Sequence, residues 1–154
     1  MKITASLVAV SIAVLVIAVP RMSTAEDSSN DSNCPKHLHQ RTVAQVLNAH
    51  LAAFQSANAQ LLACDYADDA VFIMPATITR GRTNIRAAFA SFFTLAGGNI
   101  QVTTNSSTIA DDIALLEYAV TSSHVTVSDG VDSFVIDNGL IVVQTAHLGG
   151  LAIQ

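Results

Sequence analysis

Two polar side chains occupy positions where the surrounding pattern is apolar, and both can take part in proton transfer. His50 falls on the apolar stripe of a helical segment between positions 43 and 54, so its imidazole should face the core or lie at its edge. Asp132 shares one face of a β-rich segment with Phe134 and Ile136, because side chains alternate along a strand. If the two side chains converge, they could bind an oxyanion together or simply form an Asp–His ion pair.

Each candidate also has a purely structural interpretation. His50 could be a histidine at the edge of the core that is bonded to a backbone carbonyl. Asp132 could be exposed at the end of a strand, beside a turn at residues 128–130. His124 and His147 are the remaining candidates for a general base, and both fall in segments where strand alternation favours a solvent-facing side chain.

No metal or cofactor motif is found in the sequence. Asp65, Asp68 and Asp69 lack the spacing of a calcium-binding loop and its bidentate Glu, so this acidic segment is interpreted as a structural turn. His37 and His39 lie near one cysteine, but no second paired element completes a zinc site. Nucleophile-elbow, P-loop, dinucleotide-binding and H-E-x-x-H motifs are absent. We therefore expect neither a metal nor a cofactor.

Helical elements are predicted in the first half of the mature chain. Apolar spacing predicts a helix over residues 39–56, and Asn58 can cap a short second helix. A short strand follows at residues 71–74. Thr83 can cap a third helix, which ends at the glycine pair 97–98.

The second half is rich in Val, Ile and Thr. The predicted strands span residues 100–104, 113–127, 131–136 and 140–147. Turn residues separate them at 111–112, 128–130 and 137–139. Helices followed by strands predict an α+β fold, with the N-terminal helices packed on one face of a curved antiparallel sheet.

Two neighbouring segments carry a family resemblance. Residues 66–75 (YADDAVFIMP) lead from an acidic turn into an apolar strand that a proline ends, and residues 81–89 (GRTNIRAAF) open a helix with glycine. Over residues 40–148 the chain resembles the NTF2-like superfamily, in its SnoaL-like and ketosteroid-isomerase-like branch. The resemblance implies a cone with an apolar pocket between helices and sheet, and a homodimer formed through the outer sheet face.

The resemblance also implies roles for three positions. His50 takes the place of a pocket tyrosine that donates a hydrogen bond to the substrate oxygen. Asp132 takes the place of a protonated aspartic acid that donates a hydrogen bond to an oxyanion. Met74, before Pro75, replaces the aspartate that shuttles the proton in the isomerases, and a thioether cannot do so. The resemblance therefore supports a polar site but not the isomerase reaction.

The N-terminus has the pattern of a secretory signal. Lys2 precedes an uncharged apolar run at residues 3–19, and the small residues Ser23-Thr24-Ala25 follow. We predict that residues 1–25 are a signal peptide and that the protein is exported, either to a periplasm or into the medium. The alternative is an uncleaved anchor, because the apolar run is near the lower limit for a membrane span.

The remaining chain divides into two parts and is acidic. Residues 26–38 form a polar, flexible arm, and residues 39–154 form the domain. Cleavage removes Lys2 and Arg21, so five of the seven cations face all twelve acids and the formal charge becomes −7. This charge disfavours nucleic acid and anionic lipid as partners, so we expect no membrane contact after signal cleavage.

Cys34 and Cys64 are the two cysteines of the chain, both outside the signal segment. In an oxidising compartment a single disulfide between them is the natural interpretation. The alternative is two unpaired thiols, because a sequence does not establish the geometry that a disulfide needs.

Together these features suggest an exported SnoaL-like protein that binds a small apolar molecule. Any catalysis would be acid–base chemistry of isomerase, cyclase or dehydratase type, using His50 and Asp132 without a cofactor. The expected pocket-lining residues are Phe54, Phe72, Met74, Phe89, Phe93, Phe134 and Ile136. The alternative is a non-enzymatic binding or dimeric interaction module whose own Phe and Met side chains fill the pocket. A cavity below roughly 300 Å³ would favour this alternative.

Overall fold

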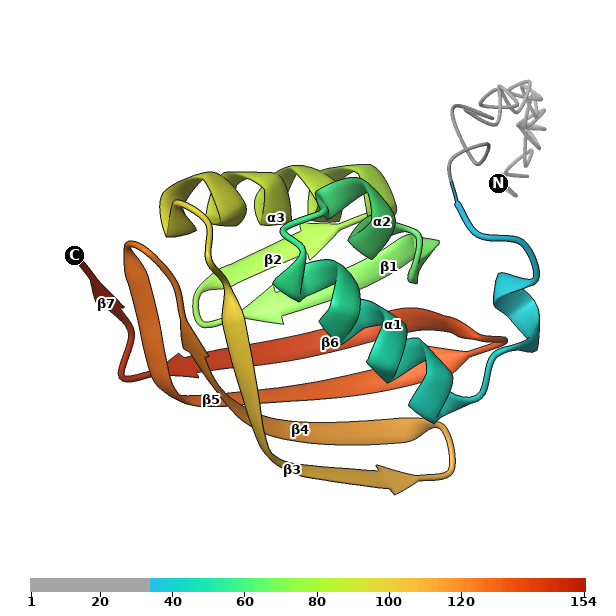
Figure 1. The fold of residues 1–154 in the computed structure, drawn as a ribbon. Helices are drawn as coiled ribbons and strands as arrows, with labels where there is room; N and C mark the ends of the chain where they lie inside the picture. Colours follow the sequence, from blue (N-terminus) through green and yellow to red (C-terminus); the bar gives the residue numbers. More distant parts are fainter. Residues whose placement is uncertain (1–33) are drawn as a thin grey trace, which may run out of the picture.

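The structure is a computed structural model that describes residues 34–154. The predicted signal peptide at residues 1–25, and residues 26–33 of the predicted arm, lie outside this range. Three α-helices cover one face of a curved, open sheet (Figure 1). Within the described range, no helix has the length and apolar character that crossing a membrane requires.

The first two helices begin at side-chain caps. A 3-10 turn at Leu38–Gln40 precedes α1 (Val43–Gln55) and α2 (Ala59–Ala63). Thr42 caps α1 in a capping box with Gln45, and Asn58 caps α2 as predicted. The buried face of α1 includes His50, so the apolar stripe faces the sheet.

Helix α3 (Arg82–Ala96) begins directly after Gly81, which is earlier than a cap at Thr83 predicts. Its N-cap is Gly81, which has a φ of 83° and no side chain to supply a cap, so the prediction that Thr83 caps the helix is wrong. The Gly81 N–H bonds to Ala70 O at 2.8 Å, and this contact fixes the start of the helix against the first strand. Gly97, with a φ of 72°, ends α3 as predicted.

The first strand is longer than its apolar core. β1 (Tyr66–Met74) includes Asp68 and Asp69, and β2 (Thr77–Arg80) returns beside it as a hairpin strand that the sequence analysis missed. The predicted acidic turn is therefore wrong: these two aspartates are exposed on the strand, at a register shift between Tyr66 and Val71.

The remaining strands form the floor of the cone. They are β3 (Gln101–Ala110), β4 (Ile113–Thr121), β5 (Val125–Asp137), β6 (Leu140–Gly149) and the short β7 (Ala152–Ile153). The turn predicted at residues 128–130 is wrong, because β5 continues through it and the chain reverses at residues 122–124. There Ser122 Oγ accepts a hydrogen bond of 2.9 Å from the Val125 N–H and holds the turn.

The sheet is mixed rather than purely antiparallel. Its order is β2-β1-β6-β5-β4-β3, with β7 paired to β5, and β1 runs parallel to β6. The other pairs are antiparallel, and β4, β5 and β6 follow one another as a meander. The apolar core lies between the concave face of this sheet and the helices.

Two cross-links hold the N-terminal strap, which we define as residues 34–42, against the domain. Cys34 and Cys64 form the predicted disulfide, with Cα atoms 5.5 Å apart. Arg41 contacts the buried carboxylate of Asp65 at 2.5 Å and donates to Gly139 O at 2.9 Å. The strap is thus fixed both to the start of β1 and to the β5–β6 turn.

Candidate functional site

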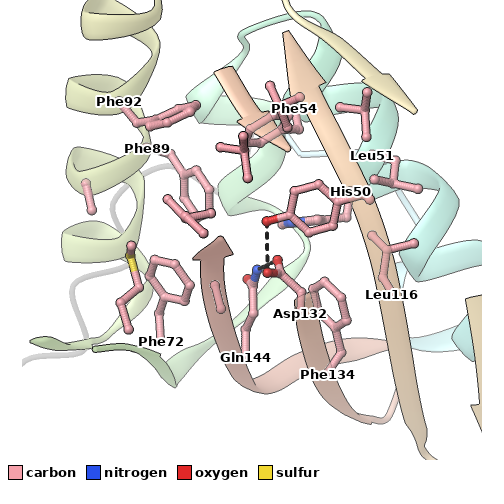
Figure 2. A pocket seen from close by; sticks show the side chains of 18 residues that line it. His50, Leu51, Phe54, Phe72, Phe89, Phe92, Leu116, Asp132, Phe134 and Gln144 are labelled. Carbon is pink, nitrogen blue, oxygen red and sulfur yellow. Dashed lines mark hydrogen bonds between the residues drawn. The ribbon is translucent and has the colours of Figure 1, made fainter. Parts of the chain in front are cut away.

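A cavity of about 110 Å³ lies between helices α1 and α3 and the concave face of the sheet (Figure 2). Its walls are mostly aromatic and aliphatic. The lining residues are His50, Leu51, Phe54, Phe72, Met74, Ala88, Phe89, Phe92, Val102, Leu116, Tyr118, Val120, Val127, Asp132, Phe134, Gln144, Ala146 and Leu148. Three polar side chains among them, those of Tyr118, Asp132 and Gln144, belong to one hydrogen-bond network.

Asp132 is at the centre of this network. It is only 6% exposed, because the pleat of β5 directs it inward together with Phe134. Its Oδ1 accepts a hydrogen bond of 3.0 Å from the Tyr118 hydroxyl on β4, and its Oδ2 accepts one of 2.7 Å from Gln144 Nε2 on β6. Both carboxyl oxygens therefore act as acceptors, which favours a carboxylate over the donor role implied by the isomerase pattern.

A second tyrosine fixes the orientation of the Gln144 amide. The Tyr66 hydroxyl, on β1, donates a hydrogen bond to Gln144 Oε1. Since the carbonyl oxygen of the amide is thereby engaged, its NH₂ group points to Asp132. Four neighbouring strands thus each contribute one member of a buried chain of hydrogen bonds, and such chains specify a single arrangement of their members.

Burial shifts the proton equilibria of this network. Desolvation raises the pKa of Asp132 to about 7, although the hydrogen bonds from Gln144 and Tyr118 act in the opposite direction. Burial and the nearby Asp132 carboxylate raise the pKa of Tyr118 well above its usual range, so its hydroxyl stays protonated. Near neutral pH the site contains one titrating acid and one permanent donor.

His50 faces the same cavity but is not part of the network. It is 3% exposed, its Nδ1 has no hydrogen-bond partner, and its ring packs edge-on against those of Phe134 and Tyr66. Desolvation lowers the pKa of His50 to about 4, so the imidazole is neutral near pH 7. The structure brings His50 and Asp132 to one cavity, while the bonds of the Asp132 carboxyl go to Tyr118 and Gln144 instead.

The other predicted lining residues divide into two groups. Five of them line the cavity, namely Phe54, Phe72, Met74, Phe89 and Phe134. Phe93 and Ile136 do not, and both are buried in the core instead. Ile136 lies beyond a register shift in β5, and Phe93 lies one helical turn past Phe89.

The two other histidines that the sequence offers as general bases do not line the cavity. His147 is exposed on β6, and His124 is exposed in the β4–β5 turn, where its ring lies against Gly97. In the described part of the chain, no cluster of three or more His, Cys, Asp or Glu side chains could hold a metal ion.

Tyr118, Gln144 and Tyr66 are site residues that sequence reasoning missed. Tyr118 alternates with Leu116 and Val120 along β4, so its inward direction was available from strand periodicity. Gln144 interrupts an apolar run in β6, which is the same kind of signal that singled out Asp132.

A buried acidic residue outside the cavity has a structural role. Burial raises the pKa of Asp65 to about 6, while the bond and the charge of Arg41 act in the opposite direction. Its Oδ2 lacks a partner, and its backbone carbonyl accepts a hydrogen bond of 2.8 Å from the Ile141 N–H. Asp65 therefore joins the strap, β1 and β6.

The fold and its sequence pattern define the family. The profile of the SnoaL-like domain family matches residues 47–144, which is more than half of the chain, so the protein belongs to this family. No curated protein matches the chain in a sequence comparison.

Solved structures of NTF2-like proteins share the architecture. SalBIII, described as an epoxide hydrolase/cyclase-like enzyme of pyran ring formation in the polyether salinomycin, superposes with a TM-score of 0.61 at 13% identity over 72% of this chain and 95% of its own. A protein with a ketosteroid-isomerase-like fold from Catenulispora acidiphila, in complex with trimethylamine, superposes with a TM-score of 0.60 at 17% identity, over 73% of this chain and 91% of its own. A putative polyketide cyclase from Sinorhizobium meliloti superposes with a TM-score of 0.57 at 20% identity, over 66% of this chain and 93% of its own. These similarities establish the NTF2-like fold.

Proposed function

We propose that the protein binds a compact, largely apolar molecule in this cavity, and that one polar group of the ligand meets Asp132. The observation that carries the proposal is the buried Asp132 carboxyl in a largely apolar chamber. Burying an ionisable carboxyl is unfavourable even when its oxygens accept hydrogen bonds, as those of Asp132 do, and a role in ligand binding would explain why it is there. The unpartnered Nδ1 of His50 is a second buried polar group without a structural explanation.

The same geometry suits acid–base chemistry without a cofactor. A general base works best when its pKa is near the working pH, and burial places Asp132 there. The Tyr118 hydroxyl would hold the carboxylate in place, and His50, as a neutral imidazole, would offer a hydrogen bond to the ligand. Enzymes described as cyclase-like among the structural relatives support this reaction class.

The volume of the cavity restricts the ligand. About 110 Å³ is below the ~300 Å³ of ordinary substrate pockets and near the ~150 Å³ of a cavity that holds benzene. A ligand of a few heavy atoms fits this space. Trimethylamine, which is present in the structure of one relative, is a molecule of that size. The small volume also favours the alternative, a non-enzymatic module whose Phe and Met side chains fill its pocket.

The outer face of the sheet suggests the partner. On the face turned away from the helices, one row of apolar side chains crosses β4, β5, β6 and β1. Its members, which are neighbours in the strand register, are Ile113, Val135, Val143 and Val71, and Ile113 is 49% exposed. We propose that a second copy of the chain covers this row, since a row of apolar side chains across four strands is typical of an interface. The variant Leu115→Glu, on the same face, should yield monomers.

The disulfide supports export, because such bonds persist in oxidising compartments. One experiment tests the ligand and the dimer together: native mass spectrometry of the mature protein purified from its own host. A retained small molecule that the Asp132→Asn variant no longer carries would support the proposed function. A dimer without bound molecules, which also binds no member of a small-molecule fragment library, would favour the filled-pocket module.

A further inference from the structure

The charge inside the cavity is unbalanced. Asp132 is the single Asp or Glu among the lining residues, and no Lys or Arg lines the cavity in the described chain. Three of the five Lys and Arg residues in the described chain have partners elsewhere: Arg41 contacts Asp65, Arg82 contacts Asp68, and Arg86 donates to Gln60. His50 cannot take their place near neutral pH, because burial lowers its pKa to about 4.

The walls around this carboxyl are aromatic. Rings from α1, α3, β1, β4 and β5 line the cavity, namely Phe54, Phe72, Phe89, Phe92, Tyr118 and Phe134 (Figure 2). The face of an aromatic ring attracts a cation within about 6 Å of its centroid, and such cages bind quaternary ammonium groups. A cavity of about 110 Å³ leaves a bound ion little room to lie farther from the walls.

Resting on the proposed function, we propose that the ligand of this cavity is a small organic ammonium ion, with Asp132 as its counter-ion and the aromatic rings as its cage. Methylated ammonium fits these walls better than a metal ion or a free ammonium ion, because its methyl groups pack against apolar rings and its charge is weakly hydrated. A neutral apolar ligand would fit the rings equally well but would leave the carboxyl without a counter-charge.

Binding should then follow the ionisation of Asp132. The groups near this carboxyl are Tyr118 on β4, Gln144 on β6, Tyr66 on β1 behind Gln144 and, across the cavity, His50 on α1, while α3 contributes only apolar side chains. Burial and the charge of Asp132 raise the pKa of Tyr66 well above its usual range, so Tyr66 also stays protonated. Between pH 6 and pH 8, Tyr118 stays protonated, Gln144 does not titrate and His50 stays neutral. Because burial raises the pKa of Asp132 to about 7, a quaternary ammonium ion should bind about tenfold more tightly at pH 8 than at pH 6.

The test compares two probes of the same shape by NMR titration of the mature protein. Tetramethylammonium carries the charge, and tert-butyl alcohol has a similar volume without it. At pH 8 we expect tetramethylammonium to bind about tenfold more tightly than tert-butyl alcohol, or tighter still. Asp132→Asn should remove this preference and its pH dependence while tert-butyl alcohol still binds, and Asp129→Asn, an exposed substitution on the same strand, should change neither.

A second variant keeps the test independent of Asp132. Phe92→Leu removes one ring of the cage but preserves apolar bulk, so it should weaken tetramethylammonium more than tert-butyl alcohol. Equal or tighter binding of the alcohol to the wild type would overturn the ammonium proposal and leave the proposed function standing. If neither probe shifts the resonances of cavity residues, both the ammonium proposal and the proposed function are wrong.

Discussion

Asp132 makes a measurable contribution to the pH dependence of stability. Its pKa in the folded protein is raised by burial from 3.8 to about 7, so the folded state binds this proton more tightly than the unfolded chain. The stability that this proton provides is fully present below pH 3.8 and is lost as the pH rises through about 7. The ligand binding that we propose at Asp132 would thus use a residue whose ionisation lowers stability at neutral and alkaline pH.

The variant Asp132→Asn should therefore become relatively more stable as the pH rises. Between pH 5 and pH 8 the difference in unfolding free energy, variant minus wild type, should increase by about 2–3 kcal/mol, because asparagine does not titrate. Urea denaturation at several pH values measures it. Asp65 and His50 titrate in both proteins, so their contributions cancel. A flat difference would mean that Asp132 titrates normally.

At the scale of the residue, the sequence predicted which way a side chain faces better than which side chains it bonds to. Strand and helix periodicity correctly placed His50 and Asp132 on inward faces, and both line one cavity. The partners of Asp132 come from β4 and β6, and their identity depends on a strand register that one sequence does not determine. Tyr118 and Gln144 were therefore missed, although each alternates with apolar neighbours.

At the scale of the element, Gly130 makes room for the network. It lies opposite Tyr118 in the β4–β5 pair, and a Cβ at Gly130 would be 2.5 Å from a carbon of the Tyr118 ring. The sequence Ser128-Asp129-Gly130 has turn composition, which is why a turn was predicted there. In the structure, this glycine is a strand residue that lets an aromatic ring cross its backbone.

The substitution Gly130→Ala should displace the Tyr118 ring. We expect a loss of about 1–3 kcal/mol in unfolding free energy from overpacking. The pKa of Asp132 should rise further, because the bond from Tyr118 lowers it in the wild type. Thermal unfolding and an NMR titration measure the two effects. Tyr118→Phe is the matched control: it removes the hydroxyl without a clash, so it should reproduce most of the pKa change with less destabilisation.

Element types were predicted more accurately than element boundaries. Periodicity identified the three helices, and composition gave the turns at 111–112 and 137–139. The hairpin strand β2 was missed because four residues after a proline carry little periodic signal. The parallel pairing of β1 with β6 was missed too, because it joins segments that lie far apart in the chain.

At the scale of the whole molecule, the strap is fixed at one end of the domain and the cavity lies elsewhere. No strap residue lines the cavity, and Figure 1 shows the strap beyond the N-terminal end of α1. The disulfide closes a separation of 30 residues between the strap and the end of α2. Its contribution should therefore be to the stability of the fold rather than to ligand binding.

Replacing the disulfide, by Cys34→Ser with Cys64→Ala, tests this separation of roles. In the chain-entropy model the loss of unfolding free energy is roughly 3–4 kcal/mol, because the unfolded chain regains the freedom of the open loop. The affinity for tetramethylammonium or tert-butyl alcohol, measured well below the new melting temperature, should stay within about twofold of the wild-type value. Adding a thiol reductant to the variant should change nothing further. A large loss of affinity with the fold intact would instead show that the strap supports the cavity walls, through the contact of Arg41 with Asp65 and the start of β1.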